Sequence, residues 1–290
     1  MSPEMIGVLG IAILLLLILI KIPVGISLIL VGLIGFGLIR NWNVGFNQLG
    51  TSLFDTTSSY SLSVIPLFIL MGMVLSYSGI GRDLYNAVDK WIGHLKGGLA
   101  IATIGTSAIF SAISGSVNAT TATVAKITLP EMEKYNYKPS LSTACVAAGG
   151  TLGILVPPSV ILILYGILTM EPIGALLIAG IIPGILQMII FIITISILVK
   201  RDPSLAPARH TKASMNEKFS SLKSVWPFFL LFALSIGGIY FGVFTPTEAA
   251  GVGALGALFF AFITRRLNVQ NFLSSMNDSV RLTAMIFLII

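Results

Sequence analysis

Residues 114–123 read SGSVNATTAT, and residues 149–159 read GGTLGILVPPS. Both stretches consist largely of small, polar and helix-breaking residues, and both lie within long apolar sequence. Because lipid offers no hydrogen bonds to an interrupted backbone, such interruptions at membrane depth persist only where they are buried or line a site. We therefore predict that the two stretches form one binding site, which the rest of the chain holds and moves.

The composition is that of a helical membrane protein. The 290 residues are 56% hydrophobic and 10% charged, with a mean hydropathy of +0.98, whereas soluble domains have about 25% charged residues. The apolar runs at 11–20 and 185–199 are continuous rather than alternating, which favours membrane-spanning helices over barrel strands. We predict an all-α polytopic membrane protein. The single cysteine, Cys145, excludes a disulfide framework or a cysteine metal cluster.

The apolar pattern predicts the order of the elements. Apolar helices at 5–20 and 22–39 precede a polar interfacial segment at 40–63, a helix at 64–77 and an amphipathic surface helix at 79–98. A re-entrant hairpin at 99–133 turns at residues 114–116, and a span at 140–169 is broken at 149–158. A full span at 174–199, a basic loop at 200–223, helices at 226–241 and 248–264, a loop at 265–281 and a helix starting at 281 complete the chain.

These elements group into four parts. Residues 1–98 hold scaffold helices and an amphipathic arm helix, and residues 99–169 form half of a transport domain, with the hairpin (99–133) and the broken helix (140–169). Residues 170–224 hold a span and the basic loop, and residues 225–290 begin a second, inverted repeat.

The charges support this topology. Of the 17 Lys and Arg residues, it places all except Arg40 on the same side of the membrane. Since positive residues mark the cytoplasmic side, the hairpin is expected to open toward the cytoplasm. The net charge of +6 is explained by this location, and we expect no nucleic-acid binding.

The broken stretches carry chemistry suited to ions. The helix that starts near Ser116 directs its N-terminal amides at the hairpin tip, which suits a carboxylate. The helix that ends near Ser114 presents free carbonyls, and Gly153, Val156 and the two prolines at 157–158 supply more. Carbonyls and hydroxyls without a strong negative charge suit Na⁺, and secondary transporters build their sites from such discontinuous helices. The candidate substrate contacts are Ser116, Asn118, Thr120, Thr151 and Ser159.

Other interpretations were weighed for the same residues. Hydroxyl residues also mediate ordinary helix packing in membranes, which is the simpler role for Thr143 and Thr151. An intramembrane serine protease would need a histidine within the membrane, but His94 and His210 fall in basic surface segments. There is no Walker A or H-E-x-x-H motif. We therefore predict no catalytic residues, no enzyme activity, no cofactor and no metal other than Na⁺.

Several motifs follow one another along the chain. They are VIPLFILMG (64–72), GHLKGGLA (93–100), SGS (114–116), LPEM (129–132), VPPS (156–159), AGIIPG (179–184) and GVFTPTEAA (242–250). In this order the motifs resemble one family, the large membrane subunit (DctM-like permease) of TRAP transporters, the tripartite ATP-independent periplasmic transporters. The resemblance covers nearly the whole chain.

The resemblance implies an inverted-repeat, elevator-type importer in the bacterial cytoplasmic (inner) membrane, with Na⁺ as the coupling ion. A periplasmic substrate-binding protein would deliver an organic acid, such as a C4-dicarboxylate or sialic acid, and a small membrane subunit would brace the scaffold in the lipid bilayer. The family's sodium site maps onto Ser114, Ser116, Gly153, Val156 and Pro158.

The chain also departs from the family. Thr120 stands where many members have an acidic residue, and Lys126 where a small residue is usual; these differences bear on the substrate. The second hairpin and its Thr-Pro-Pro break are missing, so we expect the native protein to continue beyond Ile290. A binding-protein-independent Na⁺/carboxylate symporter and a non-transporting scaffold subunit are the alternative functions.

Overall fold

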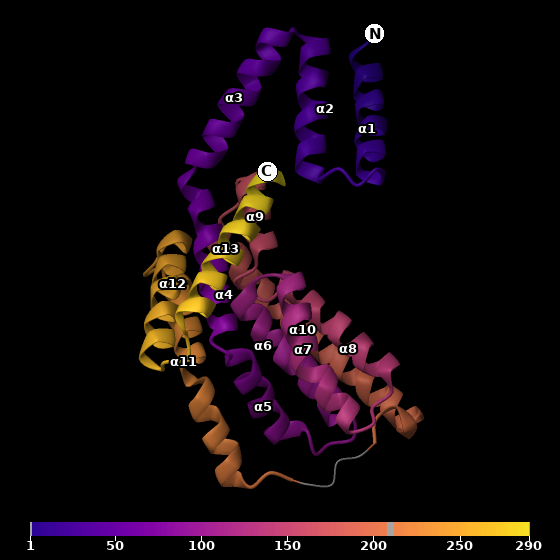
Figure 1. Cartoon of the computed structure of the whole chain (residues 1–290), viewed down its shortest axis with the longest axis vertical. Helices are drawn as coiled ribbons and strands as arrows, with labels where there is room; N and C mark the ends of the chain where they lie inside the picture. Colours follow the sequence, from indigo (N-terminus) through magenta and orange to yellow (C-terminus); the bar gives the residue numbers. More distant parts are fainter. Residues whose placement is uncertain (1, 208–211, 290) are drawn as a thin grey trace. The chain divides into compact units, whose positions relative to one another are not determined.

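The computed structural model describes residues 2–207 and 212–289, and every regular element within them is a helix (Figure 1). The predicted all-α class is confirmed. Four helical stretches of the described residues are long and apolar enough to span a membrane, namely Tyr60–Tyr77, Ile173–Arg201, Met215–Tyr240 and Pro246–Ile263. The chain divides into two compact units, of which one holds residues 1–63 and 280–290 and the other holds residues 64–279.

The first unit begins with helices α1 (Pro3–Leu19) and α2 (Val24–Ile39), which pack against each other as an apolar pair. The predicted interfacial segment at 40–63 is also helical, as α3 (Trp42–Ser58) and a 3₁₀ turn (Tyr60–Ser63). Its start is fixed by Asn41, whose side-chain oxygen accepts a hydrogen bond from the Val44 N–H at 2.8 Å.

In the second unit, α4 (Val64–Tyr77) has the predicted bounds. The amphipathic arm helix, predicted over 79–98, is shorter, because α5 (Ile80–Ile92) ends at Gly93 and the chain turns before α6. Both α4 and α5 belong to the same compact unit as the hairpin. The hairpin helices are α6 (Gly98–Ser114) and α7 (Val117–Lys134), and the broken span consists of α8 (Pro139–Thr151), a 3₁₀ turn (Leu152–Ile154) and α9 (Val160–Thr169). The remaining elements are α10 (Ile173–Arg201), a 3₁₀ turn (Pro203–Leu205), α11 (Met215–Tyr240), α12 (Pro246–Ile263) and α13 (Val269–Ile289), of which α13 belongs to the first unit from residue 280 on.

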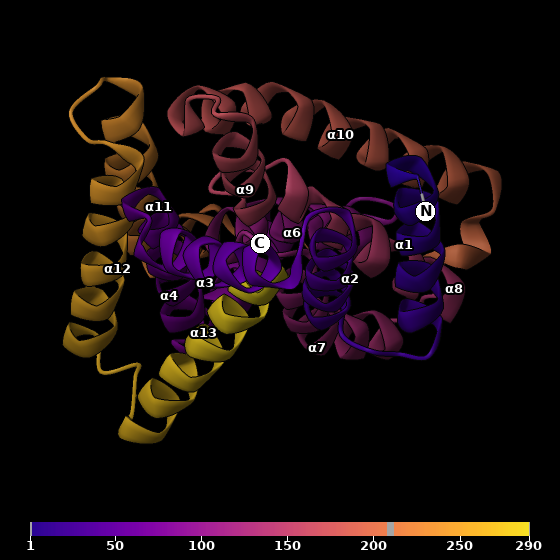
Figure 2. The same ribbon diagram turned by 90° about the horizontal axis from the view of Figure 1, so that it is seen from above.

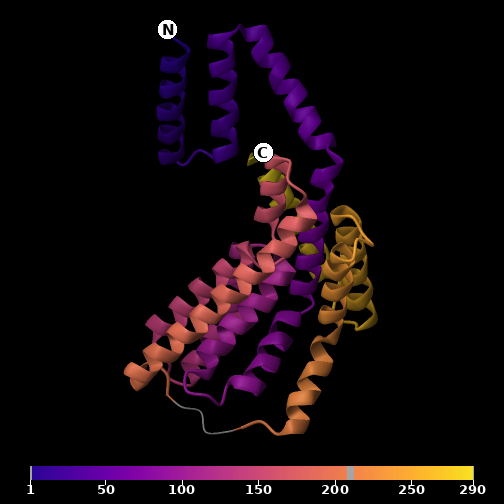
Figure 3. The same ribbon diagram turned by 180° about the vertical axis from the view of Figure 1, so that it is seen from behind.

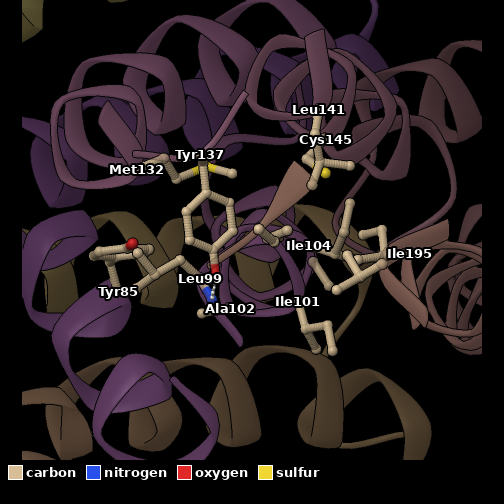
Figure 4. Packing of buried hydrophobic residues seen from close by; sticks show 14 of the residues in the cluster. Tyr85, Leu99, Ile101, Ala102, Ile104, Met132, Tyr137, Leu141, Cys145 and Ile195 are labelled. Carbon is tan, nitrogen blue, oxygen red and sulfur yellow. Dashed lines mark hydrogen bonds between the residues drawn. The ribbon is translucent and has the colours of Figure 1, made fainter. Parts of the chain in front are cut away.

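Helix α6 is the centre of this unit. It contacts α4, α5, α7, α8 and α10, and almost all of its residues are buried. Its glycines and alanines allow neighbouring helices to approach closely, as is typical of helix packing in membranes. Figure 4 shows Leu99, Ala102 and Ile104 of α6 surrounded by side chains from other elements, among them Tyr137 and Ile195.

The outer helices complete the unit. Helix α12 packs against both α4 and α11 (Figure 2). The long α10, drawn in salmon to orange in Figure 3, contacts α6 and α9. The ends of α8 and α10 are tied together, because the Lys138 ammonium pairs with the Asp202 carboxylate at 3.3 Å and the Lys138 N–H donates to the Leu205 carbonyl at 3.0 Å.

Two predicted loops are shorter than expected. The loop at 200–223 gives way to α11 at Met215, because Ser214 and Glu217 form a capping box in which each side chain binds the other residue's backbone N–H. The part of that loop at 208–211, including His210, lies outside the described residues. The predicted loop at 265–281 is also too long, because α13 already starts at Val269. The Asn268 side chain caps this helix by accepting a hydrogen bond from the Asn271 N–H at 2.6 Å.

Candidate ion and substrate site

The hairpin turns at Gly115 and Ser116. Gly115 ends α6 with φ of +57°, a left-handed conformation that glycine adopts without the strain other residues suffer. Ser116 is extended and caps α7, its hydroxyl oxygen lying 3.5 Å from the Ala119 N–H. Because α6 and α7 then pack against each other, the sequence SGS forms the tip of a helical hairpin, as predicted.

Hydroxyl groups close this tip. The Ser114 and Thr120 hydroxyl oxygens lie 2.6 Å apart and share a hydrogen bond, and both side chains are buried. The Ser116 N–H donates to the Ser114 hydroxyl oxygen at 3.3 Å. Ser114 and Thr120 therefore lock the end of α6 to the first turn of α7.

The broken helix leaves carbonyl groups without their usual donors. Pro157 has no N–H, so the Gly153 carbonyl cannot receive the hydrogen bond that a helix would supply from that position. The Val160 N–H, which would reach the Val156 carbonyl in a continuous helix, donates instead to the Gly115 carbonyl at 3.2 Å. Among the described residues, no backbone N–H outside the helices binds the Val156 carbonyl. Such oxygens are suitable cation ligands.

The tip and the break are in direct contact. A Cβ atom added to Gly115 would lie 2.6 Å from the Pro158 carbonyl oxygen, and one added to Gly153 would lie 3.0 Å from the backbone of Ser116. The two stretches that the sequence singled out therefore meet. Among the five predicted Na⁺ ligands, Ser114, Ser116, Gly153 and Pro158 come together here. The fifth, Val156, directs its side chain at α10, where it would lie 3.1 Å from a Cβ on Gly184.

The predicted substrate residues are spread more widely. Ser116 and Thr120 are at the tip, and Asn118 is exposed on the first turn of α7. Ser159 is buried and caps α9, its hydroxyl oxygen accepting from the Leu162 N–H at 3.4 Å. The Thr151 hydroxyl accepts from the Gln187 side-chain amide of α10 at 3.1 Å. Thr151 thus faces α10 in this structure, and its role toward a substrate stays a prediction.

Sequence reasoning missed residues of α6 and α4 that lead up to the tip or lie against it. Ser107 and Ser111 of α6 are buried, and their hydroxyls have no hydrogen-bond partner among the described residues. They precede Ser114 at helical spacing, which was a usable signal. Gly72 of α4 lies against the end of α6, because a Cβ there would be 2.5 Å from the Ile113 carbonyl oxygen.

The sequence profile of the family described as "Tripartite ATP-independent periplasmic transporter, DctM component" matches residues 11–290. The chain belongs to this family. The expected resemblance to this family is thereby confirmed.

Curated members of the DctM family agree with this assignment. The chain is 37% identical to the C4-dicarboxylate TRAP transporter large permease protein DctM of Pseudomonas aeruginosa, covering 84% of the chain and 56% of that protein. It is 35% identical to the sialic acid TRAP transporter large permease protein SiaM of Vibrio cholerae, covering 92% of the chain and 62% of that protein. The ectoine TRAP transporter large permease protein TeaC of Halomonas elongata is 34% identical, with the same coverage. The chain therefore spans less than two thirds of the length of each of these relatives.

Proposed function

We propose that this chain is the transmembrane subunit of a sodium-coupled secondary importer of organic acids. The observation that carries the proposal is the contact between the hairpin tip and the broken helix. It brings the tip, with its buried hydroxyls at Ser114 and Thr120, against Gly153, whose carbonyl has lost its helical donor. The Val156 carbonyl, three residues on in the same break, has lost its donor too. Neutral oxygens of this kind suit a monovalent cation such as Na⁺. Secondary transporters commonly build their ion and substrate sites from interrupted helices.

The same tip suits a carboxylate. Helix α7 starts at Val117, directly after the tip, and its first N–H groups carry the partial positive charge of the helix dipole. A carboxylate at this end and Na⁺ at the carbonyls would stabilise each other through their opposite charges, which provides a physical basis for coupled binding. The relatives named for C4-dicarboxylates and sialic acid support an organic acid as the solute.

The assembly follows from family membership as a further part of the proposal. A periplasmic binding protein delivers the solute, a small membrane subunit braces the scaffold, and the complex lies in the bacterial inner membrane. The hairpin and broken helix move together as one elevator-type body, because Val160 and Gly115 are joined by a hydrogen bond and tight packing. Residues 225–290 then start an inverted repeat that supplies the other half of the site.

Solute uptake into proteoliposomes that contain the complete transporter tests this function. Ser116→Ala removes the cap of α7 at the tip, and it should abolish or strongly reduce uptake driven by a Na⁺ gradient. Ser196→Ala on α10 is the matched control, because the Ser196 hydroxyl is exposed and binds only the Ile192 carbonyl of its own helix.

The outcomes separate the alternatives. An uptake rate of the unmodified protein that does not depend on the Na⁺ gradient would contradict sodium coupling. Uptake that needs Na⁺ but no binding protein would favour an independent symporter. Full uptake in Ser116→Ala, with normal membrane insertion, would favour a scaffold role for this segment of the chain.

A further inference from the structure

A cavity lies along α7, the return helix of the hairpin. It has a volume of about 480 Å³ and is walled by α4, α5, α7 and α13, and all the residues that line it belong to the second compact unit. This size is typical of pockets that hold small organic molecules. Its lining is Met73, Ser76, Tyr77, Gly79, Gly81, Arg82, Ala119, Ala122, Thr123, Lys126, Ile127 and Asp278.

The cavity contains two cations without partners. Arg82 and Lys126 line it, and neither has a hydrogen bond or ion pair within the part of the chain that the structure describes. The acids close to them are already engaged: Asp83 is paired with Arg266, and Asp278 accepts a hydrogen bond from the Tyr77 hydroxyl at 2.5 Å. Both cationic side chains are exposed, so they are free to contact a ligand in the cavity. The cavity thus has one more positive than negative charge available to a ligand.

The return helix connects this cavity to the hairpin tip. Ala119, Thr123 and Lys126 lie on one face of α7. At the tip, Ser116 caps the same helix and Thr120 follows at its start. At 1.5 Å per residue, Thr123 and Lys126 lie about 10 to 15 Å along the helix from Ser116. A solute that leaves the tip could move along α7 to reach the cavity.

We propose that this cavity is a second binding station for the transported organic acid, in which Lys126 and Arg82 hold its carboxylate. The inference rests on the proposed transport function and extends it to a specific site. Asp278 and the Tyr77 hydroxyl face the same space and would accept hydrogen bonds from a hydroxyl or ammonium group of the solute. The cavity therefore selects a carboxylate that also carries a hydrogen-bond donor.

Kinetics of uptake test the station in the complete transporter. The solutes are malate, N-acetylneuraminate and ectoine, and the variants are Lys126→Gln and Arg82→Gln. Each variant should raise KM for the transported acid at least tenfold while the dependence on Na⁺ concentration stays unchanged. Lys126→Arg should restore KM to near that of the unmodified protein. Lys134→Gln is the matched control, because Lys134 is at the end of the same helix and lies over the Tyr135 ring instead of lining the cavity.

Electrostatic probing of the cavity gives a second readout that needs no known solute. In a Cys145→Ala background, Thr123→Cys should react faster with an anionic than with a cationic methanethiosulfonate reagent. Adding Lys126→Gln and Arg82→Gln should lower that rate ratio about tenfold.

These experiments distinguish failure of the second binding station from failure of the proposed transport function. Na⁺-dependent uptake with an unchanged KM in both glutamine variants would overturn the second station and leave sodium-coupled transport intact. An unchanged rate ratio at Thr123→Cys would overturn it too, whichever solute is carried. Loss of Na⁺ dependence in the unmodified protein would count against the transport proposal itself.

Discussion

The Val160 N–H donates a hydrogen bond to the Gly115 carbonyl at 3.2 Å, which joins the hairpin tip to the start of α9. The bond exists because the prolines at 157–158 interrupt the helix and leave the Val160 N–H free to turn away from Val156. The same interruption frees the carbonyls that we assign to Na⁺. One local break in the sequence thus provides both the ligands and the contact that positions them.

Gly115→Ala should disrupt the tip. Its φ of +57° costs a non-glycine residue about 1–2 kcal/mol, and the new Cβ would lie 2.6 Å from the Pro158 carbonyl oxygen. We expect a lower unfolding temperature in detergent and loss of Na⁺-dependent uptake. Gly251→Ala is the control, because nothing lies within 4 Å of its added Cβ; it should be neutral or stabilise α12 by up to about 1 kcal/mol. Equal effects of the two changes would contradict the assigned contact.

Ser114 and Thr120 should be energetically coupled. Removing the Ser114 hydroxyl leaves that of Thr120 buried without a partner, at a cost of about 1–3 kcal/mol. Removing the Thr120 hydroxyl should cost less, because Ser114 keeps its hydrogen bond from the Ser116 N–H. Removing both should cost less than the sum of the single changes. A double-mutant cycle of Ser114→Ala and Thr120→Val, followed by chemical unfolding in detergent, measures the coupling. Additive effects would show that the two hydroxyls act independently.

Tyr137→Phe should destabilise the start of α6. The Leu99 N–H is one of the helix's first amides and donates to the Tyr137 hydroxyl at 3.3 Å in a buried position (Figure 4). Losing that acceptor should cost about 1–3 kcal/mol. Tyr165→Phe, an exposed tyrosine on α9, should change the unfolding temperature little. A Tyr137→Phe protein as stable as the unmodified one would contradict this role.

Asp202 should make the α8–α10 junction sensitive to acid. Its pKa is lowered below 3.8 chiefly by the hydrogen bond from the Ser204 hydroxyl, with further help from Lys138. A depressed carboxyl pKa contributes stability that is present above the unfolded-state value and is lost as pH falls through the folded-state value. We therefore expect hydrogen exchange at the Lys138 amide to be faster in Asp202→Asn than in the unmodified protein near pH 6. The difference should vanish well below pH 3.8. A difference that persists in acid would contradict the assignment.

Local signals in the sequence predicted much of the fold. The helix at 64–77 has the predicted bounds, and the small polar residues at 114–116 mark the hairpin turn. The start of α11 was predictable in principle, because Ser214 and Glu217 have the spacing of a capping box. The basic residues that follow Glu217 led us to predict a loop there instead of a helix.

The cavity along α7 could not be predicted from sequence. Arg82, Lys126 and Asp278 come from three different helices, and only tertiary packing brings them to one space. The orientation of the Thr151 side chain could not be predicted from sequence either, because a residue beside a helix break can face either the tip or α10. Its hydrogen-bond partner, Gln187, is distant in sequence.

Thermal unfolding of the full chain in NaCl and in KCl, at equal ionic strength, tests the sodium site most directly. A ligand that binds only the folded state stabilises it by about 2.7 kcal/mol at one hundred times its Kd. We expect NaCl to raise the unfolding temperature above that in KCl, Ser114→Ala to abolish the difference, and Ser196→Ala to retain it. Identical unfolding temperatures of the unmodified protein in the two salts would contradict Na⁺ binding where the hairpin tip meets the broken helix.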